Sequence, residues 1–292
     1  ITTDVAIIGA GPVGLFAVFE LGMLKIQACV IDTLPAVGGQ CTALYPEKPI
    51  YDIPGFPAVD AQDLIKNLEA QAAPFAPQYV LGEQVVKVEK HPSGDWKLET
   101  NKGTVITAKA ILIAAGCGAF GPNRPPLAGI EQYEGTSVHY MVTRREDFRG
   151  AEIVIAGGGD SAVDWAVSLA EVAQKIYVVH RRDKFRAAPD MVDKMQALAA
   201  SGKIEMVVPY QLEGLEGESS ALKAVVVKNM DGSTRSLPAQ HLLAFFGLSM
   251  ELGPIAQWGL GLTGNHIAVT RGTMQTSVPG IFAIGEIGRA HV

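Results

Sequence analysis

The N-terminal stretch of the chain decides the fold, because an apolar run leads directly into a glycine-rich turn: Asp4-Val5-Ala6-Ile7-Ile8-Gly9-Ala10-Gly11-Pro12-Val13-Gly14. An apolar, helix-compatible stretch follows at residues 15–24, and a second apolar run at 26–31 ends at Asp32. The order strand, Gly-x-Gly-x-x-Gly, helix, strand and acid is the dinucleotide-binding fingerprint in the context that it requires.

The three glycines and the acid each have a physical role in this fingerprint. Gly9 permits the tight turn, Gly11 lets the backbone approach a pyrophosphate, and Gly14 lets the helix pack closely on the strand. The helix N-terminus presents free N–H groups to the phosphates, and Asp32 can accept hydrogen bonds from ribose hydroxyls. The first unit therefore predicts an FAD or NAD site.

The same unit recurs in the second half of the chain. Residues 152–156 are expected to form a strand, 161–173 a helix and 175–179 a second strand. The loop between the first strand and the helix is Gly157-Gly158-Gly159-Asp160-Ser161-Ala162. Gly9 precedes Asp32 by 23 positions, and Gly157 precedes His180 by the same 23. Two copies at equal spacing predict an α/β protein with two Rossmann-like domains.

The end of the second strand carries arginines where the first unit has an acid. The acid's place is taken by His180, and Arg181, Arg182 and Arg186 follow it. A carboxylate there would repel a 2′-phosphate, whereas arginines can hold one bidentately. We therefore predict an NADP site formed by Gly157, Gly159, Asp160, Ser161, Ala162, His180, Arg181, Arg182 and Arg186. The alternative is a solvated charged face, and the position directly after a strand favours the phosphate site.

Composition excludes several other classes of function. The chain has 292 residues, and 24 basic against 30 acidic side chains leave a net charge of −6, which argues against nucleic-acid binding. Its three cysteines lie far apart, with no disulfide framework or zinc spacing, so no metal site is expected and a reducing cytoplasm fits. The apolar runs are short and interrupted, so we expect no membrane span.

Further motifs give the sequence a specific resemblance over nearly its whole length. They are Gly38-Gly39-Gln40 with Leu44-Tyr45-Pro46-Glu47-Lys48, Ile50-Tyr51-Asp52 leading to Gly55-Phe56-Pro57, Ala115-Gly116-Cys117-Gly118-Ala119-Phe120, Val138-His139-Tyr140, the second glycine loop with its arginines, and Phe246-Gly247 with Trp258-Gly259-Leu260. Together they resemble the thioredoxin-reductase-like ferredoxin (flavodoxin)–NADP+ reductases of bacteria and archaea.

The resemblance implies a two-dinucleotide-binding flavoprotein in which the NADP domain is inserted into the FAD domain. The FAD domain would comprise residues 1–118 and 248–292, and the NADP domain residues 119–247. The FAD site would be formed by Gly9, Gly11, Gly14, Asp32, Gln40, Tyr45, Val85, Phe120 and Glu286. In this assignment Tyr45 stacks on the isoalloxazine, Val85 contacts the adenine through its backbone, and Phe120 lies by the flavin.

The chemistry implied by the resemblance places few demands on side chains. Hydride passes from NADPH to flavin N5, and the flavin then releases electrons singly to ferredoxin or flavodoxin, so we name no general acid or base. Cys41 has no second cysteine nearby in the sequence, and the stretch around His139 has none at all. Disulfide reduction is therefore chemically implausible. We interpret Cys41 as a small packed residue and His139 as a packed or hydrogen-bonded histidine.

The partner and the alternatives follow from the same pattern. Arg144, Arg145, Arg149 and Lys48 could form a docking patch for an acidic electron carrier or, equally, a solvated charged face. The first alternative function is an NADPH-dependent flavoprotein reductase of another acceptor, such as a quinone, oxygen or a separate thiol carrier. The second is an inactive fragment or nucleotide-binding module.

The C-terminal residues depart from the pattern of the family. There, the stretch that ends in Gly285 continues into an Asp that binds the flavin's ribityl chain, and Glu286 stands at that position here. Residues 286–292 also match one reading frame of a short-read sequencing adapter, so we expect a C-terminally truncated fragment. The full-length protein would be a homodimer.

Overall fold

A computed structural model describes residues 1–290, apart from the side chains of residues 119, 120, 289 and 290. The chain divides into two compact units. The first unit comprises Ile1–Ala43, Val59–Gly121 and the residues from Ser249 onward, and the second comprises Leu44–Ala58 and Pro122–Leu248. The second unit is therefore inserted into the first, as the family resemblance implied.

The division differs from the expected one by small shifts of two breaks and by the placement of one segment. The sequence predicted breaks after residues 118 and 247, and the structure has them after Gly121 and Leu248. Residues 44–58 were expected in the first unit, and the structure groups them with the second. Their side chains contact the second unit, which sequence order alone does not show.

A mixed sheet forms the centre of the first unit, in the order β5-β2-β1-β8-β7-β6, with β21 also paired to β8. The pairs among β5, β2, β1, β8 and β21 are parallel, and β6, β7 and β8 are antiparallel. These strands are β1 (Thr2–Ile8), β2 (Ala28–Asp32), β5 (Gln78–Leu81), β6 (Val85–Lys90), β7 (Trp96–Thr100), β8 (Val105–Ile113) and β21 (Ile281–Ala283).

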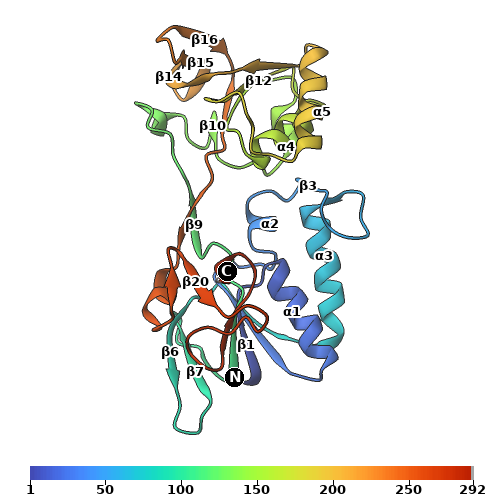
Figure 1. Cartoon of the computed structure of the whole chain (residues 1–292), viewed down its shortest axis with the longest axis vertical. Helices are drawn as coiled ribbons and strands as arrows, with labels where there is room; N and C mark the ends of the chain where they lie inside the picture. Colours follow the sequence, from blue (N-terminus) through green and yellow to red (C-terminus); the bar gives the residue numbers. More distant parts are fainter. Residues whose placement is uncertain (291–292) are drawn as a thin grey trace. The chain divides into compact units, whose positions relative to one another are not determined.

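Helices α1 and α3 lie side by side in the first unit (Figure 1). Their apolar residues share one core with Ile7 and Val30, whereas Ile8 and Ile31 belong to a second core with Leu98. Neighbouring residues of a strand point to opposite faces, so this alternation places a core on each face of the sheet. The helices are α1 (Pro12–Met23), α2 (Gln40–Ala43) and α3 (Ala61–Ala72), with 3₁₀ turns at η1 (Ala73–Phe75), η4 (Gly253–Gln257) and η5 (Gly285–Ile287).

The remaining strands of this part are short. β9 (Ala119–Pro122) and β18 (Leu248–Glu251) pair with each other and carry the chain across the two connections between the units. A small sheet has the order β19-β20-β22, with β19 (Leu262–Thr263), β20 (His266–Val269) and β22 (Gly288–Ala290). β4 (Val59–Asp60) leads into α3.

The second unit repeats the parallel arrangement. Its five-stranded sheet has the order β10-β17-β11-β12-β13, and all its pairs are parallel. Helices α4 and α5 pack together on one face (Figure 1), and a separate antiparallel sheet of β14, β15 and β16 adjoins the core that contains Val154. The strands are β10 (Val138–His139), β11 (Glu152–Ala156), β12 (Lys175–Val179), β13 (Ile204–Val207), β14 (Tyr210–Glu218), β15 (Ala221–Asn229), β16 (Thr234–Pro238) and β17 (His241–Ala244). The other elements are α4 (Asp160–Leu169), α5 (Pro189–Ala200), β3 (Pro49–Ile50), η2 (Ile130–Gln132) and η3 (Arg145–Phe148).

Both fingerprint helices begin slightly earlier than the sequence predicts. Helix α1 starts at Pro12, because Gly11 is its N-cap and proline is well suited to the first helical position. Helix α4 ends at Leu169 rather than at residue 173. Beyond this end, Val172 O accepts a hydrogen bond from Gly150 N at 2.9 Å.

Candidate functional site

The first glycine loop has the contacts that its three glycines were expected to make. Gly9 has φ +112°, and a Cβ there would overlap Ala114 O. A Cβ at Gly14 would overlap Gly9 O. At Gly11 an added Cβ would meet nothing within 4 Å, so the backbone is open on this side. An open backbone at the N-terminus of a 12-residue helix is a cradle that fits a pyrophosphate.

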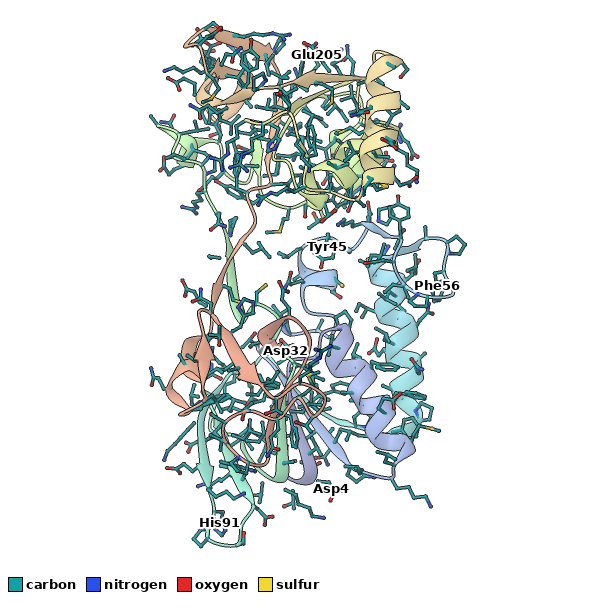
Figure 2. The ribbon with its side chains drawn as sticks, viewed as in Figure 1. Asp4, Asp32, Tyr45, Phe56, His91 and Glu205 are labelled. Carbon is teal, nitrogen blue, oxygen red and sulfur yellow. The ribbon has the colours of Figure 1, made fainter. Side chains whose placement is uncertain are left out.

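Asp32 lies directly beside this loop. Its Oδ2 accepts a hydrogen bond from Ala10 N at 2.6 Å, and its Oδ1 accepts one from Leu34 N at 2.8 Å. Figure 2 labels Asp32 near the end of the sheet where α1 begins. The carboxylate therefore stands where a ribose next to the pyrophosphate would be within reach.

Val85 belongs to the chain that runs past Asp32. Glu83 N donates to Asp32 O at 3.0 Å, and Gly82 N donates to Leu34 O at 2.9 Å. Val85 follows at the start of β6 and is buried. The structure thus brings the Val85 backbone to the Asp32 end of the site, where the adenine would lie.

A third segment packs onto the first glycine loop. Gly38 N donates to Ala10 O at 2.8 Å, and a Cβ on Gly39 would lie 3.2 Å from the Gly11 Cα. The next residue, Gln40, places its Nε2 3.4 Å from the Cys117 Sγ. Gln40 thus connects the glycine pair to the turn after β8.

Sequence reasoning missed the part that Cys117 plays in this cluster. Burial raises the pKa of its thiol to about 11, and a hydrogen bond to Glu286 adds to the effect. The thiol is therefore protonated at neutral pH and free of any disulfide. Glu286 stands beside it, in the region where the flavin was expected. Only the fold reveals this contact, because no pattern in the sequence indicates it.

Two expected flavin contacts are not tested by the structure. The side chain of Phe120 lies outside the described residues. Tyr45 lies in the inserted unit, where it packs against the core cluster that contains Val163 and Trp165. Figure 2 labels Tyr45 and Phe56 on the segment 44–58. The stacking of Tyr45 on a flavin therefore stays a prediction.

The second glycine loop is built on the same plan as the first. A Cβ on Gly157 would lie 2.6 Å from Phe245 O, whereas one on Gly159 would meet nothing within 4 Å. Ala162 stands at the position of Gly14 and is buried. Gly159 is the N-cap of α4, and Ser161 is exposed in the first turn of that helix. This loop too is a cradle open to a pyrophosphate.

His180 and the arginines sit at the edge of this second cradle. The His180 ring lies against Gly158, where a Cβ would overlap it, and 5.0 Å from the Phe185 ring. Burial lowers the pKa of His180, and the three neighbouring arginines lower it further. Arg186 N donates to Gly158 O at 2.7 Å, which holds the arginine segment against the loop.

Asp160 contacts the segment that carries the arginines. Its Oδ1 accepts a hydrogen bond from Ala188 N at 3.0 Å, and its role as a nucleotide ligand stays a prediction. This hydrogen bond holds the segment that carries Arg186 against the N-terminus of α4. Among the described residues, no carboxylate forms a salt bridge with Arg181, Arg182 or Arg186. Their positive charge is available to a phosphate.

The cations of the basic patch considered for docking are paired with carboxylates. Arg149 bonds both carboxylate oxygens of Glu146, at 2.6 and 2.7 Å, and Arg144 lies 3.7 Å from Asp147. Arg145 pairs with Glu171, and Lys48 pairs with Asp164 at 2.8 Å. Each cation has a carboxylate partner, so the charge of this group is locally neutralised.

His139 is packed and hydrogen-bonded, as expected. Its Nε2 lies 3.1 Å from the His241 Nδ1, and the Phe148 ring packs edge-on to both imidazoles. Burial lowers the pKa of His139 to about 4, and the neighbouring His241 contributes to the shift. We find no role for this pair at either glycine loop.

Comparison with known proteins places this arrangement in a family. The sequence pattern of the pyridine nucleotide-disulphide oxidoreductases matches residues 3–290. The chain belongs to this family. It is 60% identical over 285 residues to a ferredoxin–NADP reductase of Paramagnetospirillum magneticum, a match that covers 98% of this chain and 85% of the relative. It is 56% identical over 288 residues to one of Rhodospirillum rubrum, covering 98% and 84%.

Solved structures of two thioredoxin reductases have a similar fold. That of Lactococcus lactis in the FR conformation superimposes with a TM-score of 0.85 at 26% identity, covering 99% of this chain and 92% of that one. That of T. acidophilum gives a TM-score of 0.86 at 23% identity, covering 99% and 91%. The predicted fold class and the family resemblance are both confirmed.

The three cysteines of the chain, Cys29, Cys41 and Cys117, are all buried. Burial also raises the pKa of the Cys29 thiol to about 11. Within residues 1–290 there is no cluster that could hold a metal ion. None of the helices described is long and apolar enough to cross a membrane.

Proposed function

We propose that this protein is an FAD-dependent oxidoreductase that transfers electrons between NADPH and ferredoxin or flavodoxin. The observation that carries the proposal is the contrast between two similar cradles. The strand beside Gly11 ends in the carboxylate of Asp32, and the strand beside Gly159 ends in unpaired arginines. One cradle suits a ribose with free hydroxyls, and the other suits a ribose with a 2′-phosphate.

The residues of the first unit would hold FAD. Gly9, Gly11 and Gly14 shape the cradle, Asp32 and Val85 adjoin the adenosine end, and Gln40 and Glu286 lie toward the Cys117 turn. The second unit would hold NADP(H) through Gly157, Gly159, Ser161, Ala162, His180, Arg181, Arg182 and Arg186, with Asp160 closing the arginine segment.

Bound FAD would supply the acceptance of a hydride from NADPH and the release of single electrons. The protein's own residues bind and orient the nucleotides. Burial raises the pKa of the Cys29 and Cys117 thiols to about 11, so neither supplies an exposed thiolate to relay electron pairs. The relatives named ferredoxin–NADP reductase support ferredoxin as the acceptor. Flavodoxin as an alternative acceptor, a homodimer and a cytoplasmic location are parts of the proposal that follow from the family resemblance and the cysteine pattern.

The test combines two measurements on the protein loaded with FAD. Anaerobic NADPH should bleach the flavin absorbance, and cytochrome c reduction should depend on added ferredoxin. Bleaching without ferredoxin dependence would reject ferredoxin and point to another acceptor. If FAD is retained and NADPH does not bleach it, the oxidoreductase proposal fails.

The nucleotide assignment has its own variant. The double substitution Arg181→Ala with Arg182→Ala removes two guanidinium groups that lack carboxylate partners. One charge-assisted hydrogen bond contributes about 1.5–3 kcal/mol, so the KM for NADPH should rise at least about tenfold to a hundredfold, the loss expected for a single such bond. The KM for NADH should change little. An unchanged ratio of the two KM values would show that the 2′-phosphate lies elsewhere.

A further inference from the structure

Residues 82–84 connect two strands of the first unit past the end of its glycine loop. They separate β5 from β6, which stand at the two ends of the strand order. Gly82 N donates a hydrogen bond to Leu34 O at 2.9 Å. Glu83 N donates one to Asp32 O at 3.0 Å. The connection is therefore bonded to the Asp32 end of the first cradle just before β6 begins.

Asn101, in the turn between β7 and β8, binds both backbone groups of the last residue of this connection. Its backbone N donates to Gln84 O at 2.8 Å, and its side-chain Oδ1 accepts from Gln84 N at 3.0 Å. The turn itself is braced, because Thr104 N donates to the Oγ1 of Thr100 at 3.1 Å and Thr100 is buried. We call the two bonds between Asn101 and Gln84 the Asn101 clamp.

The clamp fixes the direction in which the Val85 backbone points. Val85 stands opposite Thr100, and the bond from Asn101 N to Gln84 O flanks this pair. In antiparallel strands a pair flanked by such a bond is a non-hydrogen-bonded pair, so the N–H and C=O of Val85 point away from β7. β6 lies beside β7 (Figure 1), and within residues 1–290 no further strand pairs with β6 on its other side.

An N–H and a C=O on one residue match the edge of an adenine. The N1 atom of adenine accepts a hydrogen bond and its N6 amino group donates one, whereas buried backbone groups need both kinds of partner. The Val85 side chain packs in the core with Ile255, which leaves the backbone to face a ligand. Hypoxanthine has an N–H and a carbonyl at the same two positions, so a backbone held in one orientation distinguishes the two bases.

We propose that Asn101 is a positioning residue for adenine recognition. By binding Gln84 through both backbone groups, it holds the Val85 backbone in the orientation that reads the adenine edge of FAD. Asn101 acts through Gln84 and not by contact with the base. The inference deepens the proposed function and rests on it, because it assigns FAD to the first unit. Loss of the clamp should therefore reduce the preference for adenine.

The first measurement tests the clamp on the protein without FAD. Amide hydrogen exchange of residues 83–86 should be about tenfold faster in Asn101→Ala than in the wild type. Asn101→Asp should keep slow exchange, because a carboxylate oxygen can still accept from Gln84 N. Ser93→Ala is the matched control, since it removes a 2.9 Å bond to Asp95 at the opposite end of the β6–β7 hairpin. Unchanged exchange in Asn101→Ala would overturn the clamp.

The second measurement tests the reading of the base. The apoprotein is titrated with FAD and with the FAD analogue that carries hypoxanthine in place of adenine. The wild type should bind FAD at least about tenfold more tightly, because the analogue forfeits two hydrogen bonds. In Asn101→Ala this ratio of Kd values should fall at least about threefold, whereas Asn101→Asp and Ser93→Ala should keep the ratio of the wild type.

The ratio separates positioning from a general loss of stability. A merely destabilised fold weakens both ligands alike, so an unchanged ratio in Asn101→Ala would overturn the positioning role even if both affinities fall. Should Asn101→Ala not fold, Asn101→Leu also lacks the acceptor and is read in the same way. Equal affinity of the wild type for both ligands would overturn adenine recognition while leaving the proposed function standing. A wild type that binds no FAD would reject the proposed function itself, and adenine recognition with it.

Discussion

At the scale of single residues, the two glycine loops separate glycines that serve the fold from glycines that leave room for a ligand. Gly9, Gly14 and Gly157 are pressed against backbone carbonyls, so any side chain there collides with the protein itself. Gly11 and Gly159 face open space at the N-terminus of a helix. Only the second kind has no structural reason to be glycine, which indicates a ligand that approaches the backbone closely.

This difference gives a prediction for a pair of variants. Gly11→Ala should lower the stability of the apoprotein by less than about 1 kcal/mol, because the change is confined to an open N-cap. It should weaken FAD binding at least about tenfold, because the methyl group enters the pyrophosphate cradle. Gly14→Ala should instead destabilise the apoprotein by about 2 kcal/mol or more through overpacking. Urea unfolding and FAD titration measure both effects, and equal loss of stability in the two variants would contradict this assignment.

Asp160 yields a second prediction at this scale. Asp160→Asn keeps an oxygen that can accept from Ala188 N, whereas Asp160→Ala does not. We expect Asp160→Ala to loosen the arginine segment and to raise the KM for NADPH about threefold to tenfold, the worth of one hydrogen bond. Asp160→Asn should bind NADPH as well as the wild type or better, since it also removes a negative charge near the phosphates. If Asp160→Asn binds NADPH weakly, the negative charge of Asp160 is itself required.

At the scale of elements, the contact between β10 and β17 contains a half-buried histidine pair. The pKa of His139 is lowered to about 4 by burial, with a contribution from His241, and burial also lowers the pKa of His241, while Asp147 opposes the shift in both. The unfolded chain titrates near the ordinary histidine pKa of about 6.5. Between these two values the unfolded state binds more protons than the folded one. Stability from His139 is therefore fully present above about pH 6.5 and is lost as the pH falls toward 4.

The prediction concerns the slope of stability against pH. One proton contributes up to about 1.4 kcal/mol per pH unit. Urea unfolding between pH 7 and pH 5 should show a flatter dependence in His139→Leu than in the wild type. His91→Gln is the control, because His91 is exposed in the turn between β6 and β7. Equal slopes in all three proteins would contradict the assignment.

At the scale of the whole molecule, two similar units with separate cores carry the two cradles. A ligand that binds only the native state protects the backbone that it contacts. FAD should slow amide exchange at residues 9–14, 38–40 and 82–85. NADP+ should slow it at residues 157–162 and 180–188. Hydrogen exchange with each ligand alone tests the assignment, and protection in the opposite unit would reverse it.

The two cradles could be predicted from the sequence because their chemistry is local. A strand, a turn that only glycine can make, and a helix N-terminus occur within about fifteen consecutive residues, and Asp32 or the arginines follow at the end of the next strand. Parallel strands place their carboxyl ends at one edge of the sheet, so this order alone brings those residues together. The two Rossmann-like units follow from the same pattern, whereas the insertion of one unit into the other was implied by the resemblance to the family.

The contacts that regroup distant segments were decided only by the tertiary structure. Lys48 pairs with Asp164 across 116 positions of sequence, Gln40 meets Cys117 across 77, and each arginine of the expected docking patch finds its own carboxylate. These residues stand in no sequence motif that would indicate their partners. Whether a charge is free or neutralised, and to which unit a segment belongs, depends on packing between elements that the chain order does not place side by side.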